Sequence, residues 1–113
     1  MLLFVYGTLK RGQRNHRQLA GCEYVGDGVC TTYSMYTIGA TYPVIVKEEG
    51  NGLVNGEVFR VTDEHLRALD VFEDVDGGLF VRVSADITMD FGESVLAFAY
   101  AYVPELPPLG IWS

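Results

Sequence analysis

The sequence contains little positive charge and no long apolar run. Lys and Arg together number 8 against 15 Asp and Glu, so the formal net charge at pH 7 is −7. Nucleic-acid backbones and anionic membrane surfaces attract basic proteins, and the deficit of positive charge argues against both as partners. No stretch approaches the roughly 18 consecutive apolar residues of a membrane-spanning helix. The sequence therefore predicts no nucleic-acid or membrane partner, and it leaves the oligomeric state open.

Cysteine is also scarce, since Cys22 and Cys30 are the two in the chain. The apolar start, Met1–Val5, has neither the basic region, the length nor the cleavage site of a secretion signal. We therefore expect a soluble, cytoplasmic protein in which both thiols are reduced. A zinc site would need two more ligands, and His16 and His65 lie at no recognised zinc spacing. We predict no metal site.

The remaining composition is that of one globular domain. The residues are 49% hydrophobic and 20% charged, which is an ordinary composition for a globular protein. A chain of 113 residues is long enough to bury a core and too short for two domains. We expect a single domain over residues 1–113. Its last residues, from about 104, contain Pro104, Pro107 and Pro108 and should be irregular.

Hydrophobic periodicity and turn residues predict six strands and two helices. A short helix should begin near Asn15 as its N-cap and stop at Gly21, and Thr62 should cap a longer one. The EEGNG segment reads as a hairpin turn, and Asn55-Gly56 allows a bulge. This order predicts an α+β fold with a strongly curved, barrel-like sheet. The expected strands are Leu2–Tyr6, Glu23–Ile38, Tyr42–Val46, Leu53–Val61, Leu79–Thr88 and Val95–Val103, and the helices are Asn15–Ala20 and Thr62–Asp74.

Glu73 is the most informative single residue. It follows Leu66 by seven positions, and at about 100° per residue it returns to the apolar face of the helix. Burial and the helix C-terminus both disfavour a negative charge there, so we expect a raised pKa and a carboxyl able to exchange protons near neutral pH. The alternative is a Glu at a frayed helix end, in solvent or paired with an Arg. The same alternative applies to Asp70, whereas Asp74 and Asp76 read as solvated loop acids.

The stretch VYGTLKRGQRNH, Val5–His16, follows the first strand. Gly7 and Gly12 resemble the start of a phosphate loop, but Gln13-Arg14 replaces the required Lys-Ser/Thr, so that interpretation fails. A sharp strand-to-helix turn remains, in which backbone N–H groups without ladder partners can bind an anion or polarise a carbonyl. An ordinary tight turn is the alternative. The basic residues Lys10, Arg11, Arg14 and Arg17 read as a solvated rim.

Several of these segments together resemble a known family. The strings VYGTLKRGQRNH, YPVIV, LVNGEVFRV, ALDVFED and LFVRV match the gamma-glutamylcyclotransferase-like family in order and spacing, over about Leu2–Val83. The similarity is greatest to its gamma-glutamylamine cyclotransferase branch. Two positions depart from the family pattern: Asp74 stands where many relatives have Gly or Ser, and Phe80 stands where a Tyr is usual. Tyr100 reads first as strand packing, with a pocket wall as the alternative.

The resemblance implies a small twisted mixed β-barrel with two packed helices. It implies a cofactor-independent enzyme that releases 5-oxoproline and a free amine from a small-molecule γ-glutamyl amine. Carried over by position, the substrate-holding loop falls on Tyr6, Gly7, Thr8 and Leu9, and the catalytic acid–base falls on Glu73. A cyclotransferase for γ-glutamyl dipeptides or a γ-glutamylated metabolite, a non-catalytic binding module and a structural protein with a vestigial cleft remain alternatives. The sequence does not fix the leaving amine.

Overall fold

A closed five-stranded barrel forms the body of the protein. The computed structural model describes residues 1–38, 42–47 and 53–102. The barrel order is β1-β5-β2-β6-β7, and β3 and β4 form a separate antiparallel pair. All barrel pairs are antiparallel except β1 with β7, so the sheet is mixed, as expected. The strands are β1 (Leu2–Val5), β2 (Glu23–Cys30), β3 (Tyr33–Ile38), β4 (Tyr42–Lys47), β5 (Val54–Arg60), β6 (Phe80–Met89) and β7 (Ser94–Tyr102).

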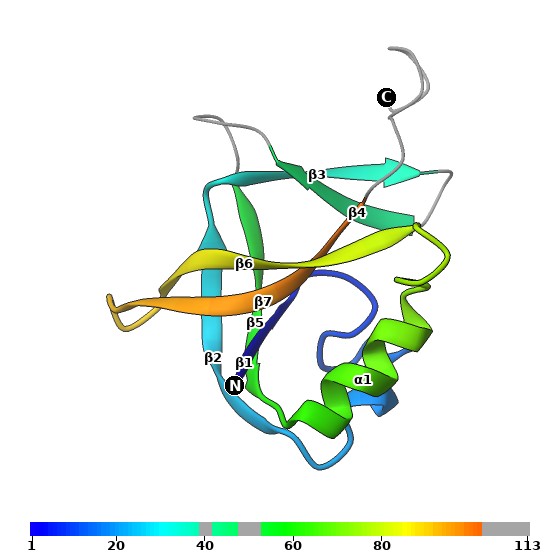
Figure 1. Ribbon diagram of the computed structural model, residues 1–113. Helices are drawn as coiled ribbons and strands as arrows, with labels where there is room; N and C mark the ends of the chain where they lie inside the picture. The colour runs from blue at the N-terminus through cyan, green and yellow to red at the C-terminus, as the bar shows by residue number, and fades with distance from the viewer. Residues whose placement is uncertain (39–41, 48–52, 103–113) are drawn as a thin grey trace.

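The described residues contain one α-helix rather than the two expected. It is α1 (Asp63–Phe72), which lies at the lower right of the barrel in Figure 1, while β3 and β4 cross the top. The expected helix over Asn15–Ala20 is a single 3-10 turn, η1 (His16–Leu19). Its cap failed because the Asn15 side chain makes no capping bond and instead donates from Nδ2 to Thr8 Oγ1 at 2.9 Å. The prediction of a second packed helix was wrong.

Two expectations about the strands also need correction. The expected strand Glu23–Ile38 is two strands, β2 and β3, that belong to different sheets. The bulge lies in β2 between Tyr24 and Gly26, not at Asn55-Gly56. Gly56 has another role, because a Cβ there would collide with the Val5 carbonyl oxygen and the Phe4 ring where β5 passes β1. The EEGNG turn and the tail from residue 104 lie outside the described residues.

The core has two parts, one inside the barrel and one between the barrel and α1. Strand β1 contributes to both, since Phe4 packs with the inner cluster while Leu3 and Val5 pack with the outer one. Alternation along β7 is equally clear. Its inward residues are the small Ala97, Ala99 and Ala101, and its outward residues include the aromatic Tyr100. Small inward side chains fit the narrow interior of the barrel, and the outward Tyr100 packs in the cluster that contains Leu66 and Leu69 of α1.

Both ends of α1 are fixed by local chemistry. At its start the Thr62 hydroxyl accepts from the His65 N–H, and His65 Nδ1 accepts from the Thr62 N–H, which is a capping box with His in the third position. At its end the N–H of Asp74 donates to the Val71 carbonyl, and that of Val75 donates to the Asp70 carbonyl. These two bonds form a Schellman motif, with Asp74 in the left-handed conformation at φ 56°. The helix thus ends at Phe72, two residues before the expected position.

Candidate active site

A cavity lies between the loop that follows β1 and the C-terminal end of α1. Its volume is about 90 Å³. The loop contributes Tyr6–Leu9, the C-cap residue of α1 contributes a carboxyl group, and β6 and β7 contribute aromatic rings. The lining residues are Phe4, Val5, Tyr6, Gly7, Thr8, Leu9, Asn15, Phe72, Glu73, Phe80 and Tyr100. The five residues proposed from sequence, Tyr6–Leu9 and Glu73, therefore surround one space.

Glu73 is the C-cap residue of α1, held there by its own N–H, which donates to the Leu69 carbonyl at 2.8 Å. Leu66 and Leu69, on the same side of the helix, are buried. Burial raises the pKa of the Glu73 carboxyl to about 7. The helix C-terminus acts in the same direction, because its unpaired carbonyls repel a negative charge. A carboxyl with this pKa can both accept and donate a proton near neutral pH.

The loop Tyr6–Leu9 is a tight turn that lines the cavity. The Lys10 N–H donates to the Gly7 carbonyl at 3.1 Å and closes the turn. Within the described part of the chain, the N–H groups of Thr8 and Leu9 have no hydrogen-bond acceptor. Free amide donors at such a turn form a site for a carboxylate or an oxyanion.

Asn15 and His16, at the start of the 3-10 turn η1, hold this loop through hydrogen bonds. The Asn15 N–H donates to the Thr8 carbonyl at 2.9 Å, and its Nδ2 donates to the Thr8 hydroxyl at the same distance. The His16 Nδ1–H donates to the Leu9 carbonyl at 2.9 Å. These bonds occupy carbonyls and leave the amide donors available. They also leave the hydrogen of the Thr8 hydroxyl available to a ligand, because the oxygen is the acceptor in its bond to Asn15.

Three of the four basic residues near the loop, Arg11, Arg14 and Arg17, are exposed, as expected of a solvated rim. Arg11 is an anchor, because its backbone N–H donates to Glu57 Oε1 at 2.8 Å and its Nε to Glu57 Oε2 at 3.4 Å. Its guanidinium also lies over the Tyr24 ring, 3.5 Å from the centroid. Arg11 is therefore exposed and also anchored, whereas Lys10 is half-buried.

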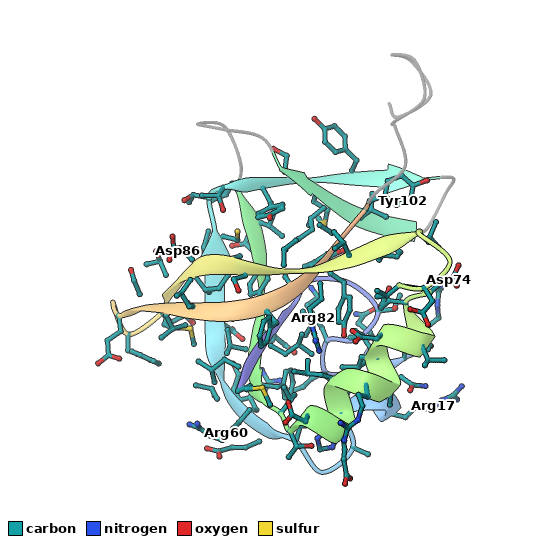
Figure 2. The ribbon with its side chains drawn as sticks, viewed as in Figure 1. Arg17, Arg60, Asp74, Arg82, Asp86 and Tyr102 are labelled. Carbon is teal, nitrogen blue, oxygen red and sulfur yellow. The ribbon has the colours of Figure 1, made fainter. Side chains whose placement is uncertain are left out.

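The outer wall of the cavity is fixed by Tyr100. Its ring is 3% exposed, and its hydroxyl donates to Asp70 Oδ1 at 2.7 Å and to the Leu66 carbonyl at 3.3 Å. Burial and the bond to Asp70 raise the pKa of this hydroxyl, so it remains a donor. Arg82 reaches the other oxygen of the same carboxylate, with Nη1 3.6 Å from Asp70 Oδ2. Figure 2 shows Arg82 on the side of β6 that faces α1.

Sequence reasoning missed five lining residues, which are Phe4, Val5, Asn15, Phe72 and Phe80. Asn15 was interpreted as a helix cap, and its contact with Thr8 depends on a tertiary fold. Phe72, the last residue of α1, is 40% exposed and lines the cavity. Phe80, noted only as a departure from the family, is buried against the cavity. Asp74 and Asp76 are exposed, as expected.

Comparison with known proteins identifies the fold and the family. Residues 3–113 match the family described as gamma-glutamyl cyclotransferase, AIG2-like. The chain belongs to this family. It is 34% identical over 122 residues to the mouse gamma-glutamylaminecyclotransferase, covering 91% of this chain and 80% of that protein. A crystal structure of a mouse AIG2-like protein has a TM-score of 0.78 and 32% identity, and the match covers 94% of this chain and 79% of that one.

Bacterial members of the cyclotransferase family are similar but longer. The Niallia circulans gamma-L-glutamyl-butirosin B gamma-glutamyl cyclotransferase is 31% identical over 105 residues, 88% of this chain and 65% of that protein. A Vibrio cholerae relative is 43% identical over 75 residues, 66% of this chain and 63% of its own length. The chain therefore spans under two thirds of the length of both relatives. In the described residues no helix is both long and apolar enough to cross a membrane.

Proposed function

We propose that this member of the cyclotransferase family converts a γ-glutamyl amine into 5-oxoproline and a free amine, with Glu73 as general acid–base. The substrate carries its own nucleophile, since its α-amine can reach its γ-amide carbonyl through a five-membered ring. No covalent enzyme intermediate, metal or cofactor is needed. The protein has to fold the substrate, move protons and stabilise the oxyanion.

One observation carries the proposal: a carboxyl with a pKa of about 7 shares a small cavity with Thr8 and Leu9, whose N–H groups have no acceptor among the described residues. The Glu73 carboxylate would take a proton from the α-ammonium, and the resulting amine would attack the γ-carbonyl carbon. Glu73 would then return that proton to the amide nitrogen as the carbon–nitrogen bond breaks. After the attack the α-nitrogen still carries one proton more than the lactam does, and Glu73 would accept this second proton and pass it to the departing amine, which leaves as an ammonium ion. Positioned acid–base catalysis of this kind contributes roughly 10²–10⁴-fold.

The loop Tyr6–Leu9 would hold the glutamyl part of the substrate. The Thr8 and Leu9 N–H groups are suited to the α-carboxylate or to the oxyanion that develops on the γ-carbonyl. One oxyanion donor is worth about 3 kcal/mol. Holding the α-amine near the carbonyl adds more, up to roughly 7–11 kcal/mol in well-oriented intramolecular reactions.

An amine leaving group fits the charges of the cavity better than an α-amino acid does. A γ-glutamyl dipeptide carries a second carboxylate beside the scissile bond, and Glu73 is the single charged side chain among the described lining residues. The stretches 39–41, 48–52 and 103–113 contain no Lys or Arg either. Inside the cavity a second carboxylate would therefore meet the like charge of Glu73, with no Lys or Arg among the described lining residues. The name of the mouse relative, a gamma-glutamylaminecyclotransferase, agrees with this preference.

A mass-spectrometric screen tests the reaction and the leaving group together. The purified protein is incubated separately with a γ-glutamyl alkylamine, a γ-glutamyl amino acid and glutathione, and 5-oxoproline is measured. We expect product from the amine substrate and little from the other two. Release from the dipeptides alone would contradict the proposed leaving group, and release from none would favour a non-catalytic binding module.

The variant Glu73→Gln tests the residue. It keeps the shape of the side chain and removes its acid–base chemistry, so turnover should fall at least about 10²-fold while substrate binding remains. Glu64→Gln, the same change on the exposed first turn of α1, is the matched control and should retain activity. Wild-type turnover by Glu73→Gln would show that another group moves the protons.

A further inference from the structure

Asp70 has a carboxylate that the reaction does not use and that the cavity does not contact. It lies on α1 one turn before Glu73, and it is absent from the residues that line the cavity. Its two oxygens have different partners on the barrel, the Tyr100 hydroxyl at 2.7 Å and Arg82 Nη1 at 3.6 Å. A side chain that binds the barrel through both oxygens at this point of the helix constrains the residues that follow it.

The two partners of Asp70 are themselves neighbours. Arg82 on β6 and Tyr100 on β7 are directly opposite each other in the antiparallel ladder. Asp70 therefore docks the last turn of α1 onto one cross-strand pair. The short bond from the buried Tyr100 hydroxyl to a carboxylate is the stronger of the two contacts, because the Arg82 pair is longer and its side chains are about one third exposed.

Tyr100 also connects this docking point to the substrate loop. Its backbone carbonyl accepts a hydrogen bond from the Tyr6 hydroxyl at 2.8 Å. The chain of contacts thus runs from Tyr6 at one side of the cavity, through Tyr100, to Asp70 and the end of α1 at the other. This chain of contacts connects the two sides of the cavity, the loop and the end of α1.

We propose that Asp70 is a positioning residue for Glu73, holding the end of α1 so that the acid–base carboxyl faces the substrate loop. This inference rests on the proposed function of Glu73. Loss of the docking contact should free the last turn of α1 while leaving the loop, and with it substrate binding, in place. The expected consequence is a lower kcat at nearly constant KM, because misplacement of a catalytic group by about 1 Å can cost up to about 100-fold.

A change in proton affinity should accompany the loss of rate. Glu73 has a raised pKa because it is buried. Among the described residues, the titratable groups around it are Tyr6 from the loop after β1 and Tyr100 from β7, with Asp70 on its own helix and Arg82 on β6 behind Tyr100. If the end of α1 moves away from the barrel, the Glu73 carboxyl regains water and its pKa falls. A residue that only stabilised the fold would lower the melting temperature without this change.

The test compares Asp70→Ala with Asp63→Ala, which removes an exposed carboxylate from the first turn of the same helix. For Asp70→Ala we expect kcat to fall about 10–100-fold with KM within about threefold, and the acid limb of the rate profile to move below about pH 7. Asp63→Ala should keep the wild-type kcat and the wild-type acid limb. An unchanged kcat and acid limb in Asp70→Ala, or a loss confined to KM, would overturn the proposal.

A second readout does not depend on turnover. The Glu73 carboxyl can be titrated by carbon-13 NMR in the wild type, in Asp70→Asn and in Tyr100→Phe, which also serve if Asp70→Ala does not fold. A midpoint that falls in both variants supports the positioning role, and an unchanged midpoint contradicts it. If the wild type releases no 5-oxoproline, the proposed function fails, and this titration still decides whether Asp70 positions Glu73.

Discussion

Asp70 and Glu73 lie one turn apart on α1, and their carboxyl groups have opposite environments. Asp70 accepts a hydrogen bond from Tyr100 and lies beside Arg82. Glu73 has no ionic partner among the residues that the structure describes, and burial raises its pKa to about 7. One helix therefore presents a carboxylate that is bound to the barrel and, one turn later, a carboxyl that can change its protonation near neutral pH. This separation of roles is the basis for the predictions below.

The rate should depend on pH through Glu73. Its carboxylate form is needed to accept a proton from the α-ammonium, so kcat/KM should rise as the pH increases through about 7. Below that value the rate should fall about tenfold for each pH unit. Measuring 5-oxoproline release from about pH 5 to about pH 9 checks this. A limb centred near the ordinary Glu value of 4.5 would contradict the raised pKa.

The same carboxyl should make the stability of the fold depend on pH. Because its pKa is raised from 4.5 to about 7, the folded state binds the proton more tightly than the unfolded state does. The resulting stability is fully present below about pH 4.5 and is lost as the pH rises through about 7. Glu73→Gln resembles the protonated form, so it should be more stable than the wild type above that range, by about 3 kcal/mol at most.

Urea unfolding at about pH 4 and about pH 8 measures this difference. The two proteins should have similar stability at the lower pH, and the variant should be the more stable at the higher one. Glu64→Gln is the matched control, and its difference from the wild type should not reproduce the change with pH. A Glu73→Gln protein that is less stable than the wild type at the higher pH would indicate that the ionised carboxylate has a partner in the folded state.

Local patterns predicted the elements of the site, whereas its supports are tertiary. The periodicity of Leu66, Leu69 and Glu73 was sufficient to place the carboxyl on the buried side of α1. The glycine turn after β1 likewise predicted free amides. The bond from Asn15 to Thr8 was not predictable, because Asn15 has the same local appearance whether it caps a helix or supports a loop. The docking of Asp70 involves Tyr100, 30 residues away in the chain.

Strand boundaries failed for a related reason. High β-propensity continues from Glu23 to Ile38, and nothing local signals that Thr31 and Thr32 separate strands of two different sheets. The split into two strands depends on pairing with distant segments, since β2 pairs with β5 and β3 pairs with β4. The exact end of α1 was missed because the left-handed residue is Asp74 rather than the glycine that usually marks such a position.

Asn15 should affect substrate binding more than the chemical step. It holds Thr8 through two hydrogen bonds, one of them from its side chain. Asn15→Ala removes the side-chain bond, worth about 1 kcal/mol, so KM should rise about 3–10-fold while kcat changes less. Gln13→Ala removes an exposed amide from the same loop and is the control. A loss confined to kcat would mean that Asn15 contacts the reacting atoms instead.

Asp74 should limit the stability of the helix end. Its φ of 56° lies in the left-handed region, where an L-residue with a side chain is strained and Asp is tolerated better than most. Asp74→Gly relieves that strain and also removes a negative charge from the helix C-terminus. Glycine partly offsets this gain, because it gives the unfolded chain more conformational entropy that is lost on folding. We expect a gain of about 0.5 kcal/mol, measured by thermal or urea unfolding. Asp74→Val, which keeps a side chain and adds a β-branch, should instead lose more than about 1 kcal/mol. Equal stability of the two variants would show that the Schellman bonds, rather than the backbone conformation of Asp74, determine where α1 ends.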